Sequence, residues 1–314
     1  MKISVVIIAK NAKNTICYTL ESLKQQTIKP DEILVIVPTT NDQTMDILKK
    51  YPEVQVIVSG QSTRGFQRAT GVQHACGDII AFIDADCVAH CRWLEALKNL
   101  YVKEDVMVQG GPILETQTLE YALRHLSQRG IVELMNSSPR RVKFLPTANI
   151  SFRKEVLDIV GNFNKRLHEG EDLDYCMRLL KHKIGIIFNP RAVVYHPVGA
   201  TEFSIKRPIR YGKSRAMLFL MYKRYLFSPT LVAIIHSSLF MIAFFALVVH
   251  QYHIFLTLMG ISLIHQLYKF WRKPIIGKQK LRTFIVNTLS AYLLYASFII
   301  HLLYYLLTSI AKNR

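Results

Sequence analysis

Apolar runs of strand length alternate with longer amphipathic segments over the first part of the chain. The strand-like runs lie at 3–8, 32–37, 54–59 and 78–84. The segments with helical spacing lie at 14–26, 41–51, 64–76 and 93–101. The runs are almost wholly apolar, as strands covered on both faces are. The alternation therefore predicts an α/β fold, with a mostly parallel sheet flanked by helices on both faces.

A second group of elements follows between residues 106 and 197. We expect, in chain order, a strand at 106–111, a long helical segment at about 117–136, a basic loop at 137–144, mixed segments at 145–163 and 167–183, and a pair of strands at 185–189 and 192–197. Open sheets of this class bind ligands beyond the carboxyl ends of their strands. Polar side chains at those ends are therefore the first candidates for chemistry.

The pattern changes from Pro229 onward, where apolar residues dominate. Three segments are long and apolar enough to predict membrane spans, at about 229–249, 252–271 and 283–307. The first has 21 residues without a formal charge, and as a helix it reaches about 31 Å, the thickness of a bilayer core. The second contains His265 and Gln266, so two readings stay open for it: a crossing helix or a re-entrant segment.

Charges near these segments predict their orientation. The loop at 272–282 is strongly basic, whereas the turn at 250–253 has no Lys or Arg. The positive-inside rule then places residues 1–228 and the basic loop in the cytoplasm. The apolar run at the N-terminus is too short for a signal peptide. We therefore expect a multi-pass protein of the cell (inner or cytoplasmic) membrane with its N-terminal part in the cytoplasm.

The net charge of +18 points to an anionic partner. The segment 201–228 mixes basic residues with apolar and aromatic ones, as an interfacial segment facing anionic membrane lipids does; a solvated basic linker is the alternative. We expect no nucleic acid, because the basic and aromatic residues are interleaved only beside the predicted spans. The chain then divides into a domain at 1–200, a linker at 201–228 and a membrane domain at 229–314.

Two acidic residues stand at the end of the fourth strand-like run. Asp84 and Asp86 lie in the sequence AFIDADCVAH, and an unpaired buried carboxylate costs several kcal/mol. Carboxylates at a strand end are able to share a divalent cation, and Mg²⁺ or Mn²⁺ is commonly held by one or two carboxylates together with phosphate oxygens of a substrate. A metal-bound diphosphate would therefore offset the cost of burying the two carboxylates.

The order of the segments resembles the family 2 glycosyltransferases with the GT-A fold, over roughly residues 3–200. The resemblance is carried by SVVIIAKN, EILVIV, RGFQRATGVQHACGDIIAFIDADC, TANISFRKEVLDIVGNF, EGEDLDYCMRLLK and AVVYH. The DADC and EGEDLD segments, in this order and about 85 residues apart, are its most specific part. It implies an enzyme that transfers a sugar from a nucleotide-sugar donor with the help of Mn²⁺ or Mg²⁺.

The resemblance also implies a role for each matching acidic residue. Asp84 approaches the ribose or the metal, and Asp86 holds the metal that bridges the donor diphosphate. Asp172 matches the general base that takes the proton of the acceptor hydroxyl, and Glu171 beside it orients the acceptor. His196 stands where some enzymes of this fold place a further metal or phosphate ligand.

Further residues match the donor site. Ala9, Lys10 and Asn11 correspond to the loop after the first strand that touches the nucleotide, and Arg68 corresponds to an arginine that contacts it. Asn149 in PTAN is a further candidate, for binding acceptor or donor sugar.

Plainer roles remain open for four of these residues. Asp172 is also an ordinary choice for the first turn of a helix, where it favours the helix dipole. Arg68 is able to pair with a surface acid, and His196 with backbone at a strand end. Asn149 is able to cap a turn.

One departure from the family pattern affects base recognition. Where the family commonly carries a pair of aspartates after the second strand, this chain has Val37 and Pro38, and Asp42 keeps only the last acid of the motif. We therefore expect Asn11 and Thr39 to contribute polar contacts to the nucleotide instead. The donor base is left open.

Together these features predict a metal-dependent, inverting glycosyltransferase whose acceptor is a lipid-linked or cell-surface glycan at the cytoplasmic face of the membrane. Two alternatives remain: a polyprenyl-phosphate sugar synthase, whose acceptor is already an anion, and a non-catalytic membrane scaffold that keeps the fold. The donor sugar, the pathway and the oligomeric state cannot be read from the chain.

Overall fold

The computed structural model describes residues 1–39, 43–61, 63–116, 118–124, 137–197, 205–222, 235, 238–239, 242–243, 245–271 and 280–312. The chain divides into two compact units, Met1–Gly199 and Ala200–Arg314. Each is described by itself.

An eight-stranded sheet forms the centre of the first unit, in the order β3-β2-β1-β4-β9-β6-β10-β8. Its strands are β1 (Ile3–Ile8), β2 (Glu32–Pro38), β3 (Val54–Ser59), β4 (Ile79–Ile83), β6 (Val108–Gly110), β8 (Arg140–Val142), β9 (Asn149–Arg153) and β10 (Ile186–Phe188). The neighbours β3, β2, β1 and β4 all run parallel. Strand β9 runs antiparallel between β4 and β6. The expected α/β fold with a mostly parallel sheet is confirmed.

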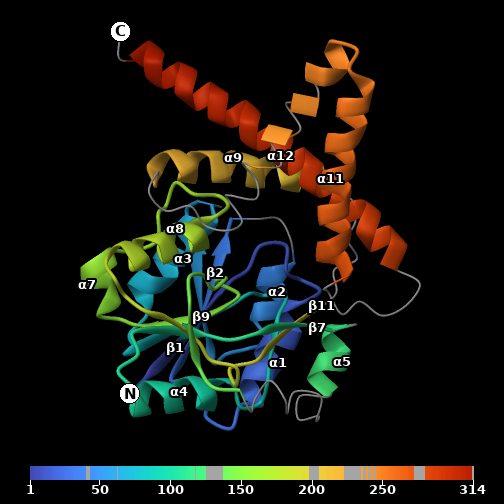
Figure 1. Cartoon of the computed structure of the whole chain (residues 1–314). Helices are drawn as coiled ribbons and strands as arrows, with labels where there is room; N and C mark the ends of the chain where they lie inside the picture. The colour runs from blue at the N-terminus through green and yellow to red at the C-terminus, as the bar shows by residue number, and fades with distance from the viewer. Residues whose placement is uncertain are drawn as a thin grey trace. The chain divides into compact units, whose positions relative to one another are not determined.

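Helices cover both faces of this sheet (Figure 1). They are α1 (Ile16–Lys24), α2 (Thr44–Leu48), α3 (Arg64–His74), α4 (Trp93–Lys103), α7 (Val156–Val160) and α8 (Glu171–Lys181). Helix α5 (Leu119–Arg124) packs instead in a small separate cluster with Val88 and Tyr18. One core joins α1, α2 and α4 to one face of the strands, and a second core joins α3, α7 and α8 to the other.

Strand β1 shows how the sequence produces two cores. Val5 and Ile7 belong to the core under α1 and α4, whereas Val6 belongs to the core under α3 and α8. Successive side chains of a strand point to opposite faces, so a strand covered on both sides needs apolar residues at every position. This is why the strand-like runs are continuous rather than alternating.

A smaller three-stranded sheet adjoins this arrangement, in the order β5-β11-β7. Its strands are β5 (Val88–Ala89), β7 (Ile113–Thr116) and β11 (Val194–Pro197). The chain enters it from the large sheet twice, from β6 into β7 and from β10 into β11. At this crossing a Cβ on Gly111 would lie 2.0 Å from the carbonyl oxygen of Ala192. Only glycine allows the two segments to approach so closely.

Two expectations from the pattern need correction or restriction. The strands expected as a pair at 185–189 and 192–197 both form, but they belong to different sheets, since β10 pairs with β6 and β8 while β11 pairs with β5 and β7. The long helical segment expected at 117–136 begins as α5, and residues 125–136 lie outside the described part of the chain.

The second unit contains α9 (Lys206–Met221), α11 (Tyr252–Trp271) and α12 (Lys280–Lys312). Helices α9 and α12 pack closely. A Cβ on Gly212 of α9 would lie 2.6 Å from the carbonyl oxygen of Leu294 of α12, so the glycine makes this approach possible. Ser297 of α12 also donates a hydrogen bond to the carbonyl of Ile209, at 2.7 Å.

One helix among the described residues is long and apolar enough to cross a membrane. Its apolar window is Thr288–Tyr305, within the span expected at 283–307. Helix α11 carries a shorter apolar stretch, Tyr252–His265, within the span expected at 252–271. The span expected at 229–249 lies mostly outside the described residues, as does the basic loop between the second and third segments.

Candidate active site

The candidate site lies at the carboxyl edge of the large sheet. Because β2, β1 and β4 are parallel neighbours, the residues that follow them share one edge. Lys10 and Asn11 follow β1 and are exposed, and Thr39 follows β2 and is also exposed. Asn11 has a φ of 55°, a left-handed conformation that asparagine tolerates better than most residues. Ala9 is buried and donates its backbone N–H to the carbonyl of Ile36.

Asp84 and Asp86 occupy the turn between β4 and β5. The backbone N–H of Cys87 donates to the carbonyl of Asp84 at 3.1 Å, which bends the chain at the end of the strand. The side chain of Asp84 is 35% exposed and that of Asp86 is 48% exposed. The two carboxylates are therefore half-open to ligands, while the chain around them is buried.

His196 is brought to Asp86 by the small sheet. Strand β11 pairs with β5 through Val194 and Tyr195, so the next residue comes beside the Asp84–Asp86 turn. The Nε2 atom of His196 lies 3.4 Å from Oδ2 of Asp86, and its Nδ1 lies 2.8 Å from the carbonyl oxygen of Pro197. A carbonyl only accepts, so Nδ1 carries a proton and Nε2 faces the carboxylate.

The Asp86 and His196 side chains shift each other's protonation. Their hydrogen bond raises the pKa of His196 above its ordinary value, although burial acts in the other direction. Burial tends to raise the pKa of Asp86, but the hydrogen bond and the charge of His196, a backbone hydrogen bond and the charge of Arg64 together hold that pKa below its ordinary value. The pair therefore behaves as an ion pair when His196 is protonated.

The same residues fit a divalent cation. Ligand atoms of Asp86, Cys87 and His196 lie within 4.8 Å of one another. Burial raises the pKa of the Cys87 thiol well above its ordinary value, so the thiol stays protonated and is a poor ligand. The remaining carboxylate and imidazole suit Mn²⁺ better than Mg²⁺, which prefers oxygen ligands.

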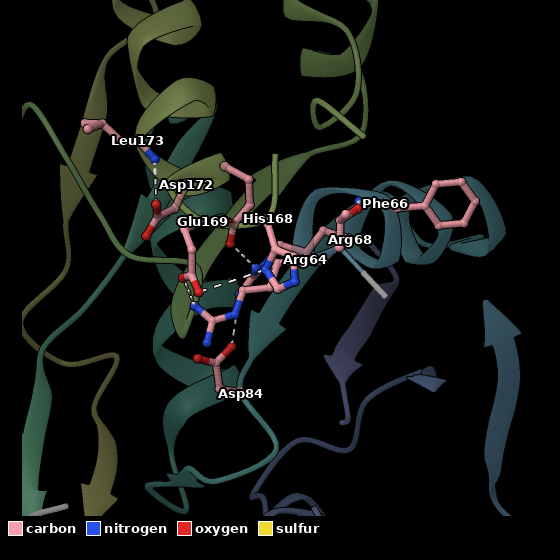
Figure 2. Close-up of polar contacts among 10 residues, drawn as sticks. Arg64, Phe66, Arg68, Asp84, His168, Glu169, Asp172 and Leu173 are labelled. Carbon is pink, nitrogen blue, oxygen red and sulfur yellow. Dashed lines mark hydrogen bonds and ion pairs between the residues drawn. The ribbon is translucent and has the colours of Figure 1, made fainter. Parts of the chain in front are cut away.

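Arg68 links the Asp84–Asp86 turn to the start of α8 (Figure 2). Its side chain is only 3% exposed, and it donates from Nη2 to Asp84 at 3.1 Å and from Nη1 to Glu171. In this structure Arg68 thus binds two carboxylates of the site itself. It joins the acidic turn to the helix that carries Asp172.

Arg64 forms a second link one helical turn earlier. Its Nη1 lies 2.9 Å from Oε2 of Glu169, whose side chain is 3% exposed (Figure 2). Sequence reasoning did not single out this pair. The spacing of the charged residues could have indicated it. The two arginines are four residues apart on α3 and so share one helix face, and the two glutamates are two residues apart in EGED.

The start of α8 places Asp172 beside this network. Gly170 has a φ of 79°, and the helix begins at the next residue, Glu171. Asp172 is partly buried, and its Oδ1 accepts the backbone N–H of Leu173 at 2.7 Å. Asp172 therefore has its backbone in the helix and its carboxylate at the helix N-terminus, where the dipole favours negative charge.

Burial raises the pKa of both acids at this helix start. The pKa of Asp172 lies above its ordinary value. Burial raises the pKa of Glu171 to about 7, although Arg68 acts to lower it and Asp172 to raise it. A carboxylate with a raised pKa is a stronger base when it is ionised, which is the property that proton transfer from a hydroxyl requires.

Asn149 lies at the same edge but faces inward. It is fully buried at the start of β9, where it stands opposite Ile83. Its amide nitrogen donates to the carbonyls of Pro112 and Ala192, at 3.0 and 2.7 Å, and its side-chain oxygen accepts from Trp93 Nε1 at 2.9 Å. These bonds tie β9 to the crossing between the two sheets.

Val37 and Pro38 are the last residues of β2 and are buried in the sheet. They pair with Val58 and Ser59 of β3. The positions where the family pattern has acids are thus filled by strand residues, and Asp42 lies outside the described residues.

Three relatives align with this chain, two of them over more than two thirds of its length and one over about half. Glycosyltransferase AglE of Haloferax volcanii is 24% identical over 226 residues, which are 70% of this chain and 74% of that protein. The glucosyl-dolichyl phosphate glucuronosyltransferase of the same organism is 24% identical over 250 residues, which are 71% and 79% of the two chains. The pre-mycofactocin glycosyltransferase of Mycobacterium tuberculosis is 31% identical over 163 residues, 48% of this chain and 34% of that one.

Among the solved structures that share the fold are those of TarS and GalNAc-T7. TarS of S. aureus, residues 1–349, aligns with a TM-score of 0.53 and 19% identity over 73% of this chain and 67% of its own. GalNAc-T7, solved with UDP, GalNAc and Mn²⁺, aligns with a TM-score of 0.54 and 18% identity over 68% and 47% of the chains. At these identities the likeness establishes the GT-A-like fold alone.

The sequence profile of one family covers the N-terminal part of the chain, which carries the acidic turn of the site. It matches residues 4–161, half of the chain, and includes β1, α3, β4, the Asp84–Asp86 turn and β9. This chain belongs to Glycosyl transferase family 2.

Proposed function

We propose that this protein is a membrane-anchored, inverting glycosyltransferase that moves a sugar from a nucleotide-sugar donor to a lipid-linked or cell-surface glycan acceptor. The observation that carries the proposal is the ion network in which Arg68 joins Asp84 to Glu171. It holds a half-exposed acidic turn next to a carboxylate, Asp172, whose pKa is raised by burial. A transferase needs both: groups that hold the donor diphosphate and a base for the acceptor.

Asp172 is proposed as the general base. A sugar hydroxyl is a weak nucleophile and must lose its proton as it attacks the anomeric carbon. The raised pKa makes Asp172 a stronger acceptor for that proton, and its place at the N-terminus of α8 fixes the carboxylate on a rigid element. Glu171, held by Arg68, is proposed to orient the acceptor. One displacement at the sugar carbon inverts its configuration.

Asp86, His196 and Asp84 are proposed to hold Mn²⁺ or Mg²⁺ together with the donor diphosphate. A bound divalent cation offsets the negative charge that develops on a nucleoside diphosphate leaving group. Lys10, Asn11 and Thr39 are exposed at the same edge and are proposed to contact the nucleotide. Two buried residues are proposed to contribute as well, Ala9 through its backbone and Arg68 through its side chain. With Val37 and Pro38 buried in β2, contacts to the base come from other residues.

A membrane location is proposed from the second unit. Helix α12 contains one apolar window of spanning length, and α9 carries basic residues, among them the exposed Lys206, Arg210 and Lys213. Basic residues beside a span favour the cytoplasmic side and anionic lipid. We propose spans at about 252–271 and 283–307, with a further one at 229–249, an interfacial segment at 201–228 and the domain at 1–200 in the cytoplasm.

The relatives support a lipid-linked acceptor. One of them is named for glucosyl-dolichyl phosphate, a sugar already attached to a lipid phosphate. Such an acceptor reacts through a sugar hydroxyl and needs a base, which agrees with the buried position of Asp172. A polyprenyl phosphate acceptor is already an anion and needs little base.

The test is transfer by the purified full chain in detergent with Mn²⁺, for the wild type, Asp86→Ala and Asp172→Asn. Asp158→Asn, an exposed aspartate on α7, is the matched control. The proposal predicts loss of at least about a hundredfold in both site variants and none in the control. A tolerated Asp172→Asn with an inactive Asp86→Ala would identify a polyprenyl phosphate acceptor. Donor binding without turnover in the wild type would identify a scaffold, which the Val37 and Pro38 replacement favours.

A further inference from the structure

Two arginines on α3 meet two glutamates that flank the start of α8. Arg64 and Arg68 are one turn apart on the helix, so they project from the same face. Arg64 pairs with Glu169 at 2.9 Å (Figure 2). Arg68 pairs with Glu171. Gly170 stands between the two glutamates and turns the chain into α8 with its left-handed φ of 79°. We call these four side chains the α3–α8 clamp.

The loop before α8 is also fastened to the first turn of α3 by backbone contacts. Thr63 Oγ1 donates to the carbonyl of Lys165 at 2.8 Å, and the N–H of Gly65 donates to the carbonyl of Leu167 at 3.0 Å. A Cβ on Gly65 would lie 2.0 Å from the carbonyl oxygen of Asn164, so only glycine permits this approach. The end of this loop, where Asp172 follows, is therefore positioned from α3.

The two arms of the clamp differ in what else they touch. Arg68 also binds Asp84 in the acidic turn, so a change there disturbs the proposed donor site directly. Arg64 is 45% exposed on its side chain, whereas Glu169 is 3% exposed. Removing the cation from a buried pair leaves a desolvated charge that must move or take up a proton. Loss of the Arg64–Glu169 arm is therefore expected to displace the loop while the hydrogen bond between Arg68 and Asp84 stays in place.

We propose that Arg64 and Glu169 are positioning residues for Asp172: their ion pair fixes the residue before Gly170, and thereby the first turn of α8, relative to the acidic turn. The inference rests on the proposed function for Asp172. A displacement of about 1 Å of a catalytic group is enough to lower a rate by up to about a hundredfold. The pair thus contributes to the chemical step by holding Asp172 in position.

Two backbone amides report the position of this turn without any activity. The N–H of Leu173 donates to the Asp172 carboxylate at 2.7 Å, and the N–H of Asp174 donates to the carbonyl of Gly170 at 2.9 Å. The Asp174 bond closes the first turn of α8, and the Leu173 bond forms when the Asp172 carboxylate folds back onto that turn. Their hydrogen exchange therefore measures the opening of the turn directly.

The experiment compares Arg64→Ala, Glu169→Ala, Glu169→Gln and Arg64→Lys with the wild-type full chain, and uses Arg166→Ala, an exposed arginine in the same loop, as the control. Measured are kcat, the donor KM and the exchange of the Leu173 and Asp174 amides. We expect Arg64→Ala and Glu169→Ala each to lower kcat by about ten- to a hundredfold, with the donor KM within about twofold of the wild type and faster exchange of both amides. Arg64→Lys, which keeps the charge, retains most of the activity.

Several results would overturn the inference. Wild-type kcat and exchange in both alanine variants would do so, and so would a raised donor KM in Arg64→Ala with a normal Glu169→Ala, which would make Arg64 a donor contact. Glu169→Gln keeps the shape of the buried side chain, so it replaces Glu169→Ala if the latter fails to fold. If the wild type transfers no sugar, the proposed function fails, while the amide exchange still decides whether the clamp holds α8.

Discussion

Replacing Arg68 with alanine tests how far the buried ion network depends on its guanidinium. Arg68 and Glu171 each have 3% of their side chain exposed, and Asp84 accepts a second hydrogen bond from Arg68 at 3.1 Å. Without Arg68, Glu171 is left as a buried carboxylate beside Asp172. Breaking a buried pair in this way costs about 3–5 kcal/mol while the remaining charge stays ionised.

The cost depends on pH, because Glu171 is able to take up a proton. Burial already raises the pKa of Glu171 from 4.5 to about 7, with Arg68 and Arg64 acting to lower it and Asp172 to raise it. The folded state thus binds the proton more tightly than the unfolded state, and the unfolding free energy falls as the pH rises from about 4.5 to about 7. Removing Arg68 raises this pKa further, so the fall continues above pH 7.

The assay is thermal unfolding in detergent at pH 5.5 and pH 8. At pH 5.5 Glu171 is mainly protonated with or without Arg68, so Arg68→Ala is expected to lower Tm by only about 3 °C. At pH 8 the ionised carboxylate is able to escape its desolvation cost by taking up a proton, which limits the further loss to about 1.4 kcal/mol, or about 3–5 °C beyond the fall at pH 5.5 for a unit of this size. The double variant Arg68→Ala/Glu171→Gln has no carboxylate to desolvate at position 171. Its fall in Tm, measured against Glu171→Gln, is therefore expected to be the same at pH 5.5 and at pH 8. An equal fall in Tm at both pH values, or a double variant that keeps the difference, would refute the reasoning.

Three further predictions concern the metal, the base and the core. EDTA is expected to abolish transfer and Mn²⁺ to restore it in the wild type but not in Asp86→Ala; full activity in EDTA contradicts the metal assignment. Because burial raises the pKa of Asp172, kcat is expected to fall as the pH drops towards that pKa. If kcat of Asp172→Asn falls with pH in the same way, Asp172 is not the base. Asn149→Ala removes three buried hydrogen bonds and is expected to cost about 2–4 kcal/mol, measured as a lower Tm; an unchanged Tm would show that the bonds are replaced.

The part of the fold that follows from local pattern was predictable. Strands such as β1 and β2 are continuous apolar runs because helices cover both of their faces, and the helices between them have the matching spacing. Strand order is different, since it depends on which distant segments pair. The antiparallel insertion of β9 between β4 and β6, and the separation of β10 from β11, leave no trace in the periodicity of these short segments.

The site was predictable only in part for the same reason. The acidic turn follows from the position of Asp84 and Asp86 at a strand end, and Asp172 followed from the family resemblance. The contact between Asp86 and His196 depends on the pairing of β11 with the two-residue strand β5, which is too short to recognise. Arg68 was expected at the nucleotide, and its buried pairing with Glu171, 103 residues away, is a tertiary contact that no local spacing encodes.

The central claim is that the acidic turn holds a donor nucleotide through a divalent cation. Its most direct test is anomalous diffraction from crystals of the protein soaked with Mn²⁺ and a nucleotide. We expect a manganese peak ligated by Asp86 and His196, with the diphosphate on the other side of the metal. A bound diphosphate with no manganese at these two residues, or manganese and nucleotide bound away from the carboxyl edge of β1 and β4, would contradict it.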